Sequence, residues 1–189
     1  MHKDFDISEL NKLSKTKLKD LGKIDLEKLA VHFTMVQSVK STPYINRYKA
    51  KDLYELEYGE VVLIKQYLTS PDTKSIEEVF KIVFECPSKL LYDHTLNQYF
   101  GAMNWVVAEI EQIQKQEVKQ LSREPSDKMK IAGIHRLNIF GELNVLVSLA
   151  KEFNTTPQEV EKWTYSTVFA LILRSNIEAE ITNELQNQK

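Results

Sequence analysis

The fold is decided by residues 93–122, DHTLNQYFGAMNWVVAEIEQIQKQEVKQLS, a stretch with no proline and a single glycine. Its apolar residues recur three or four positions apart, which places them on one stripe of a helix. The stripe consists of Leu96, Tyr99, Phe100, Met103, Val106, Val107, Ile110 and Ile113. A helix of this length spans about 45 Å, roughly the width of a small domain. We therefore expect one long helix whose stripe is covered by shorter helices from the rest of the chain.

The last part of this stretch has a different composition. After Ile113 the segment 114–121, QKQEVKQL, holds only two apolar residues. We interpret the first half of the helix as buried, and residues 114–120 as a solvated arm or as a segment that lies against something outside the domain. Gln116 and Lys119 on this segment are therefore candidate partner-binding residues.

Length and composition indicate a folded domain rather than a disordered or membrane-spanning chain. The 189 residues suffice for one domain with a sizeable core, and 42% apolar with 28% charged residues is ordinary for a globular protein. No apolar run approaches the ~18–20 residues that cross a bilayer, and residues 1–10 lack the apolar part of a signal peptide. Cys86 is the only cysteine, which excludes an internal disulfide and a cysteine-based metal site. We expect a cytosolic protein that neither enters a membrane nor is secreted.

The charges are unevenly distributed along the chain. Residues 1–51 carry eleven Lys/Arg against six Asp/Glu, whereas residues 52–122 carry six against twelve. The basic N-terminal part suits either nucleic acid or an acidic partner, or it is a solvated face that offsets the acidic middle. We favour the solvated face, because the lysines are scattered and no aromatic–arginine pattern accompanies them.

Signals for helix ends recur throughout the sequence. Ser75 with Glu78 has the spacing of a capping box, and Thr156 followed by Pro157 is a typical helix start. Gly133 and Gly141 lie inside a helical pattern, which indicates close packing or a break near residue 138. The final helix starts at about residue 165, and its apolar face comprises Val168, Phe169, Ile172, Leu173, Ile177, Ile181 and Leu185.

Residues 31–48 are the exception to the helical pattern. Apolar and polar residues alternate at 31–35, STP at 41–43 reads as a turn, and YINRY at 44–48 could pair back on the preceding residues. The sequence thus predicts a mainly α-helical bundle around one long central helix, with a short N-terminal β-hairpin as an option. We expect a basic segment over 1–51, made of short helices and this hairpin, followed by a helical domain over 52–189.

No arrangement of residues in the sequence points to catalysis, so we expect a protein that is not an enzyme. The histidines are far apart and lack metal-ligand spacing: His2, His32, His94 and His135. The glycines are isolated, which argues against a phosphate-binding loop, and no GxSxG or Cys–His motif occurs. We interpret Asp93 with His94 as a helix cap and Cys86 as packing. The prediction is therefore no catalytic, cofactor or metal site.

Three aromatic residues have two alternative roles. Trp105 lies beside the apolar stripe, and Trp163 and Tyr165 stand where the last two predicted helices meet. Trp and Tyr are favoured at interface hot spots, so these residues are candidate partner-binding anchors. Packing in the core or at the junction is the alternative that we favour.

Three stretches together resemble a group of tailed-bacteriophage proteins described as tail-assembly-chaperone-like or virion-morphogenesis proteins. The first is LEYGEVV at 56–62, similar to the group's Leu-x-(Phe/Tyr)-Gly-Glu-(Phe/Tyr)-Ile element. The second is VFKIVFECP at 79–87, which departs from the group's pattern at Cys86, where arginine is usual. The third is AGIHRL followed by FGELN, within 132–144, with Trp and Tyr downstream at 163–169. The resemblance covers about residues 52–175 and leaves the basic N-terminal part unexplained.

This resemblance implies a helical, non-enzymatic protein that acts through protein–protein contacts during phage assembly in the cytoplasm of the bacterial host. Its expected partners are other phage structural proteins of the tail or connector, and association with further copies of itself is a second expectation. No cofactor, nucleic acid or membrane is implied. The alternative is a structural subunit retained in the virion, in a ring or connector near the portal or tail.

Overall fold

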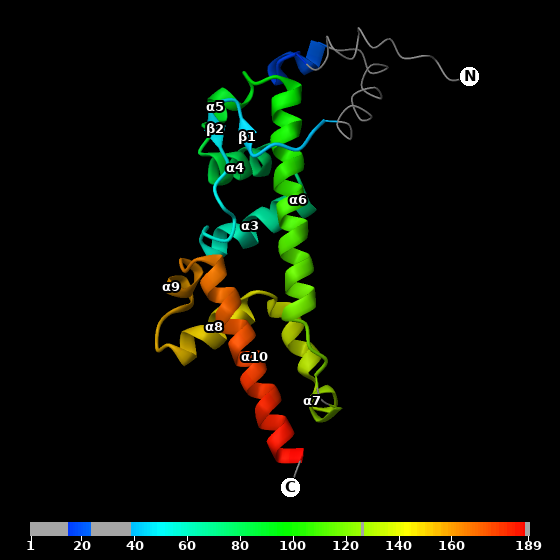
Figure 1. Cartoon of the computed structure of the whole chain (residues 1–189), viewed down its shortest axis with the longest axis vertical. Helices are drawn as coiled ribbons and strands as arrows, with labels where there is room; N and C mark the ends of the chain where they lie inside the picture. Colours follow the sequence, from blue (N-terminus) through cyan, green and yellow to red (C-terminus); the bar gives the residue numbers. More distant parts are fainter. Residues whose placement is uncertain (1–14, 24–38, 126, 188–189) are drawn as a thin grey trace, which may run out of the picture. The chain divides into compact units, whose positions relative to one another are not determined.

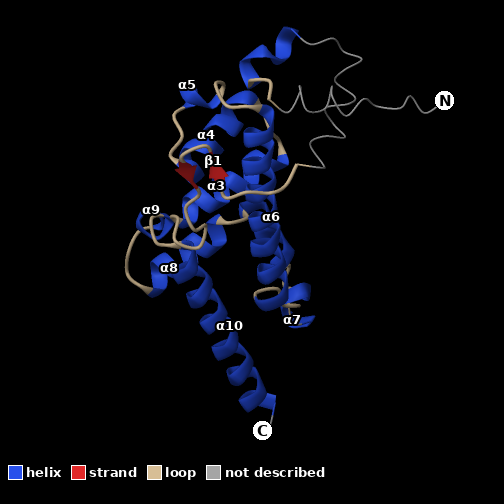
Figure 2. Ribbon diagram, turned by 45° about the horizontal axis from the view of Figure 1, so that its top comes forward, coloured by secondary structure: helices blue, strands red, loops and turns tan. Residues whose placement is uncertain are grey.

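The computed structural model describes residues 15–23, 39–125 and 127–187. Most of these residues are helical, and the named strands form one two-stranded antiparallel hairpin (Figures 1 and 2). The predicted mainly α class with a short hairpin is therefore confirmed. The alternating residues up to 38 and the predicted first helix up to residue 14 lie outside the described residues.

The chain divides into two compact units. Among the described residues, unit 1 is formed by those up to 51 and by 67–110, and unit 2 by 52–66 and by those between 111 and 187. Unit 1 contains η1 (Leu18–Lys23), β1 (Tyr44–Ile45), β2 (Tyr48–Lys49), α4 (Thr73–Phe84), α5 (Ser88–Leu91) and the first part of α6 (Leu96–Gln120). Unit 2 contains most of α3 (Tyr58–Thr69), the end of α6, α7 (Asp127–Ile131), η2 (Ile134–Phe140), α8 (Leu143–Glu152), α9 (Pro157–Glu161) and α10 (Tyr165–Asn187).

This division differs from the predicted one. Residues 67–110 group with the N-terminal part and residues 52–66 with those from 111 onward, so the compact units are not the two sequence ranges 1–51 and 52–189. The reason lies in backbone hydrogen bonds on either side of the hairpin. The Thr42 amide donates to the Gly101 carbonyl on α6 (3.0 Å), and the Lys51 amide donates to the Val83 carbonyl on α4 (2.8 Å).

The hairpin turns at a different place from the one expected. Tyr44 lies opposite Lys49 and Ile45 opposite Tyr48, so the turn is formed by residues 46–47 rather than by STP at 41–43. Asn46 has φ 54°, a left-handed conformation that asparagine tolerates better than most residues. Ile45 is fully buried, so the hairpin is anchored through this side chain.

The predicted long helix is found as α6, which has 25 residues and is shorter than the predicted stretch at both ends, and its start is capped by other residues. Thr95 and Gln98 form a reciprocal capping box, in which each side chain accepts from the other's backbone amide (3.3 and 3.1 Å). Asp93 instead pairs with Lys19 at 2.6 Å. The predicted Asp93–His94 cap is therefore wrong.

The buried stripe of α6 is narrower than expected. Val107 is 37% exposed, and Tyr99, Phe100 and Met103 are only half-buried. The fully buried residues are Leu96, Ala102, Val106, Ile110 and Ile113. Successive residues differ by about 100° around a helix, so burial of Val106 turns its neighbour Val107 toward the edge of the stripe.

The other predicted helix ends are found, and one of them is shifted along the sequence. The capping box of α4 joins Asp72 to Ser75, so α4 begins three residues earlier than the predicted Ser75 cap. The start of α9 is as predicted, because the Thr156 hydroxyl accepts from the Glu159 amide at 3.2 Å. The predicted break between Gly133 and Gly141 is also found: both have positive φ and they flank the 3-10 helix η2.

Candidate protein-binding surface

The starts of α3 and α10 are joined by backbone hydrogen bonds within unit 2. The Tyr58 amide donates to the Trp163 carbonyl, and the Tyr165 amide donates to the Leu56 carbonyl, both at 2.8 Å. Glu57 and Thr164 form the antiparallel bridge between these bonds. Each helix begins with the residue after the bridge. The phenol rings of Tyr58 and Tyr165 consequently stack, 6.1 Å apart with planes at 7°.

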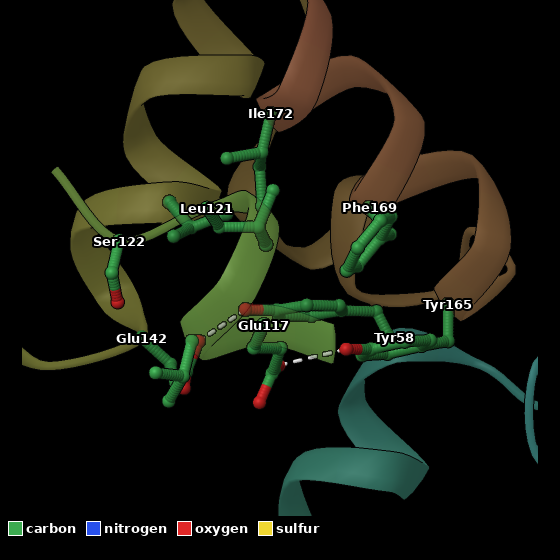
Figure 3. A pocket seen from close by; sticks show the side chains of 10 residues that line it. Tyr58, Glu117, Leu121, Ser122, Glu142, Tyr165, Phe169 and Ile172 are labelled. Atoms are coloured by element: carbon green, nitrogen blue, oxygen red, sulfur yellow. Dashed lines mark hydrogen bonds between the residues drawn. The ribbon is translucent and has the colours of Figure 1, made fainter. Parts of the chain in front are cut away.

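Each stacked tyrosine donates a hydrogen bond to a carboxylate from another segment (Figure 3). The Tyr165 hydroxyl lies 2.7 Å from Glu117 Oε1 on α6, and the Tyr58 hydroxyl donates to Glu142 Oε2. Lys65 Nζ on α3 is 2.5 Å from the same Glu117 oxygen and lies 5.4 Å from the centre of the Tyr165 ring. Glu117 therefore links α3, α6 and α10 through charge-assisted contacts.

Burial keeps both phenols protonated. It raises the pKa of Tyr58 far above its ordinary value, and the nearby Glu142 carboxylate adds to this effect. Burial also raises the pKa of Tyr165, together with its hydrogen bond to Glu117. A phenol with a raised pKa serves as a hydrogen-bond donor and is a poor nucleophile or base. The pair therefore suits a structural role.

An open hollow of about 340 Å³ lies next to this pair. Figure 3 shows Leu121, Phe169 and Ile172 on one side of it and the two hydrogen-bonded carboxylates on another. Both carboxylates already accept from a tyrosine. The hollow thus offers an apolar wall with an acidic edge, a shape that accommodates a side chain better than it supports proton transfer.

A more exposed apolar surface lies on α7 and η2, which we call the 129–140 patch. Ile131 is 88% and Ile139 82% exposed, values that are unusual for isoleucine. The patch comprises Met129, Ile131, Leu137, Ile139 and Phe140. All of these except Ile131 line one open hollow of about 610 Å³. Contiguous exposed apolar side chains are typical of protein-binding surfaces.

The glycine break explains why these side chains are exposed. Gly133 and Gly141 end the α-helical path at both sides of η2, and the tighter 3-10 turn does not keep one apolar face turned inward. The Arg136 guanidinium holds the turn by donating to the Ala132 and Gly133 carbonyls. The two glycines predict the break, whereas this surface is not among the predicted sites. The density of apolar residues beside the glycines is the signal that could have indicated it.

The sequence-predicted residues do not form one surface. Trp105 is in unit 1, half-buried, with its ring against Phe84 at 6.3 Å. Trp163 is half-buried and packs edge-on against Phe153 at 5.4 Å. Tyr165 is 1% exposed, its ring lies in the core and its hydroxyl donates to a carboxylate, which argues against the alternative of a partner-binding anchor. The packing alternative holds for this residue.

Gln116 and Lys119 lie on a segment that is not a free arm. Gln116 is half-buried and its side-chain Oε1 accepts from the Gln120 side-chain amide at 2.6 Å, while Lys119 is exposed. Between them Glu117 binds the rest of unit 2, and the Leu121 carbonyl accepts from Asn176 on α10 at 3.2 Å. Most of residues 114–120 are exposed, as predicted, but the contacts of Glu117 tie the segment to unit 2, so it does not project freely. A role of Gln116 and Lys119 in partner binding stays a prediction.

Unit 1 brings together two residues that the sequence did not connect. Cys86 Sγ lies 3.7 Å from His94 Nε2, and both side chains are buried. Desolvation raises the pKa of the Cys86 thiol and lowers the pKa of His94. Both shifts favour the neutral thiol and imidazole, the opposite of an activated thiolate–imidazolium pair. We therefore assign the pair to packing.

Among the described residues no group of three or more His, Cys, Asp or Glu side chains could hold a metal ion. Within the same part of the chain, no helix has the length and apolar character needed to span a membrane. No protein-family model, curated protein or solved structure matches this chain.

Proposed function

We propose that this protein is a non-enzymatic morphogenesis factor of a tailed bacteriophage, tail-assembly-chaperone-like, that binds another structural protein of the tail or connector. The observation that carries the proposal is the 129–140 patch, where Ile131 and Ile139 are almost fully exposed. Exposure of these apolar side chains to water is unfavourable, and covering them with a partner lowers the free energy of the system. The phage setting is supported by the resemblance of residues 56–62, 79–87 and 132–144.

A non-catalytic role is supported by the way the polar side chains of unit 2 are used. Tyr58, Tyr165 and Glu117 are engaged with one another or with neighbouring elements, which rigidifies the starts of α3 and α10. Rigid support suits a surface that must present the same apolar side chains to a partner each time. The site of action we propose is the cytoplasm of the infected bacterium.

The test is capture of tagged protein from infected cells, with partners identified by mass spectrometry. The expected result is recovery of a phage tail or connector protein by the parent and its loss with Ile139→Asp. Leu90→Asp is the control, because Leu90 is an apolar residue, 38% exposed, on α5 in unit 1, outside the patch and outside residues 114–120. Equal recovery by both variants, or recovery of host metabolic enzymes alone, contradicts the proposal.

A second candidate function is a structural subunit that stays in the virion as part of a ring. A specific observation favours it: the exposed half of α10 presents another apolar surface, with Ile177, Ile181 and Leu185 between 45 and 60% exposed. Two binding surfaces on one chain suit a repeating assembly. Proteomics of purified particles separates the candidates, because a chaperone is absent or substoichiometric whereas a ring subunit is present in fixed copy number.

A further inference from the structure

The apolar side chains of α10 form a continuous ridge. Phe169, Leu173, Ile177, Ile181 and Leu185 follow one another at intervals of four residues. The first two are half-buried and the last three exposed, so the ridge emerges from unit 2 toward the end of the helix. Side chains spaced four apart form the ridges that pack into grooves on other apolar surfaces. We call these five residues the α10 ridge.

The protein's own 129–140 patch cannot cover the α10 ridge. A different face of α10 meets the α7–η2 region: Ala179 and Glu180 line one hollow with Met129, and Glu180 pairs with Arg123 at 2.9 Å. At 100° per residue, Ile177 and Ile181 each point about 160° away from Ala179. Ile177, Ile181 and Leu185 are 45–60% exposed, so the patch of the same chain does not cover this part of the ridge.

The two surfaces carry opposite charge. Residues 174–187, around the exposed part of the ridge, contain one Arg and three Glu. Residues 127–140, which contain the patch, hold Lys128, Lys130 and Arg136 against Asp127 alone. Two ridges brought together would add glutamates to glutamates, whereas a ridge on a patch brings carboxylates toward cations. Charge thus favours a ridge-to-patch contact over a ridge-to-ridge contact.

We propose that the α10 ridge of one copy docks on the 129–140 patch of a second copy, so that the protein assembles head to tail. The inference rests on the proposed role of the patch as a protein-binding surface and names its partner. The two halves of such a contact differ, so each copy keeps one free half, and repetition gives a ring if the rotation closes or a filament if it does not.

Sedimentation of the purified full chain and of two variants tests the inference. Ile181→Asp disables the ridge and Ile139→Asp disables the patch; both side chains are exposed, so the fold is retained, as far-UV circular dichroism checks. The parent is expected to form oligomers that grow with concentration, and each variant alone to sediment as a monomer. An equimolar mixture should give dimers and nothing larger, because only one intact ridge–patch pair can form.

Other outcomes overturn the inference. If Ile139→Asp still dimerises while the mixture gains no new species, the contact is ridge to ridge. A parent that stays monomeric at all concentrations also overturns self-assembly, yet leaves the proposed function standing if the patch still captures a phage structural protein. The reverse outcome is also informative. If the mixture of variants gives dimers only and no phage protein is captured by the parent, the proposed phage partner is refuted and the head-to-tail contact stands.

Discussion

The stacked tyrosines allow a matched test of what holds unit 2 together. Tyr165 and Tyr58 are both buried, both donate to a glutamate, and their rings stack on each other. Their acceptors differ: the Glu117 side chain is 27% exposed, whereas Glu142 is an exposed residue. Replacing either tyrosine by phenylalanine keeps the ring and removes only the hydroxyl.

The exposure of each acceptor carboxylate determines how much the free energy of unfolding should fall. Loss of a hydrogen bond to a charged acceptor costs about 1.5–3 kcal/mol, and water compensates this loss less at the half-buried Glu117 in Tyr165→Phe than at an exposed carboxylate. Water can replace the lost phenol at Glu142, so Tyr58→Phe should lower the free energy of unfolding by about 1 kcal/mol or less. We therefore expect Tyr165→Phe to be the more destabilising of the two changes.

Urea unfolding followed by tryptophan fluorescence measures this difference in unit 2 alone. The two tryptophans lie in different units, so a Trp105→Phe background leaves Trp163 as the reporter of unit 2. Equal costs for the two tyrosine variants, or a larger cost for Tyr58→Phe, would show that acceptor burial does not govern these bonds. The raised pKa values add a second readout: stability present below about pH 10 should fall as pH rises further, and fall less in each phenylalanine variant.

Further predictions concern local packing, caps and titration. Gly101→Ala should cost about 1–3 kcal/mol, because its Cβ would lie 3.1 Å from a backbone carbonyl, whereas Gly59→Ala meets only an exposed glutamate side chain and should cost less; chemical denaturation compares them. Gly141→Ala should cost about 1 kcal/mol or more through its positive φ, measured in the same way. Thr156→Ala should cost about 1 kcal/mol by loss of the helix cap, seen as a lower midpoint of thermal unfolding. Since burial lowers the pKa of His94, stability should decline as pH falls below about 6.5, and unfolding at pH 8 and 5 should show a smaller decline for His94→Gln.

Helices were predictable where the sequence repeats a pattern over many turns. The long stretch at 93–122 predicts α6, which begins three residues later and ends two residues earlier, because its apolar residues keep one helical period throughout. Caps are harder to predict because several residues share the same spacing: Ser75 has the spacing of the first residue of a capping box, whereas it is the second partner, bound to Asp72. The local sequence therefore predicts that a cap exists, but it does not determine which residue is the N-cap.

The candidate surface was harder to predict because it depends on distant contacts. Glu117 looked like one of several solvated charges, and only folding brings Lys65 and Tyr165 to it, 52 and 48 residues away in sequence. The same contacts explain why Tyr165 is core rather than a surface anchor. The division of the chain was missed for a related reason: the hydrogen bonds that tie 39–51 to α4 and α6 leave no periodic pattern in the sequence.

The last helix shows how one sequence pattern can hide two surfaces. The predicted single face of α10 includes Val168, which is fully buried, and Ile177, which is 45% exposed. Nine residues separate them, and at 100° per residue they point in opposite directions. The helix is therefore apolar on two sides, a property of helices that are covered on both. Within the described part of the chain only the Val168 side is covered, and the head-to-tail contact proposed above would supply a layer for the Ile177 side.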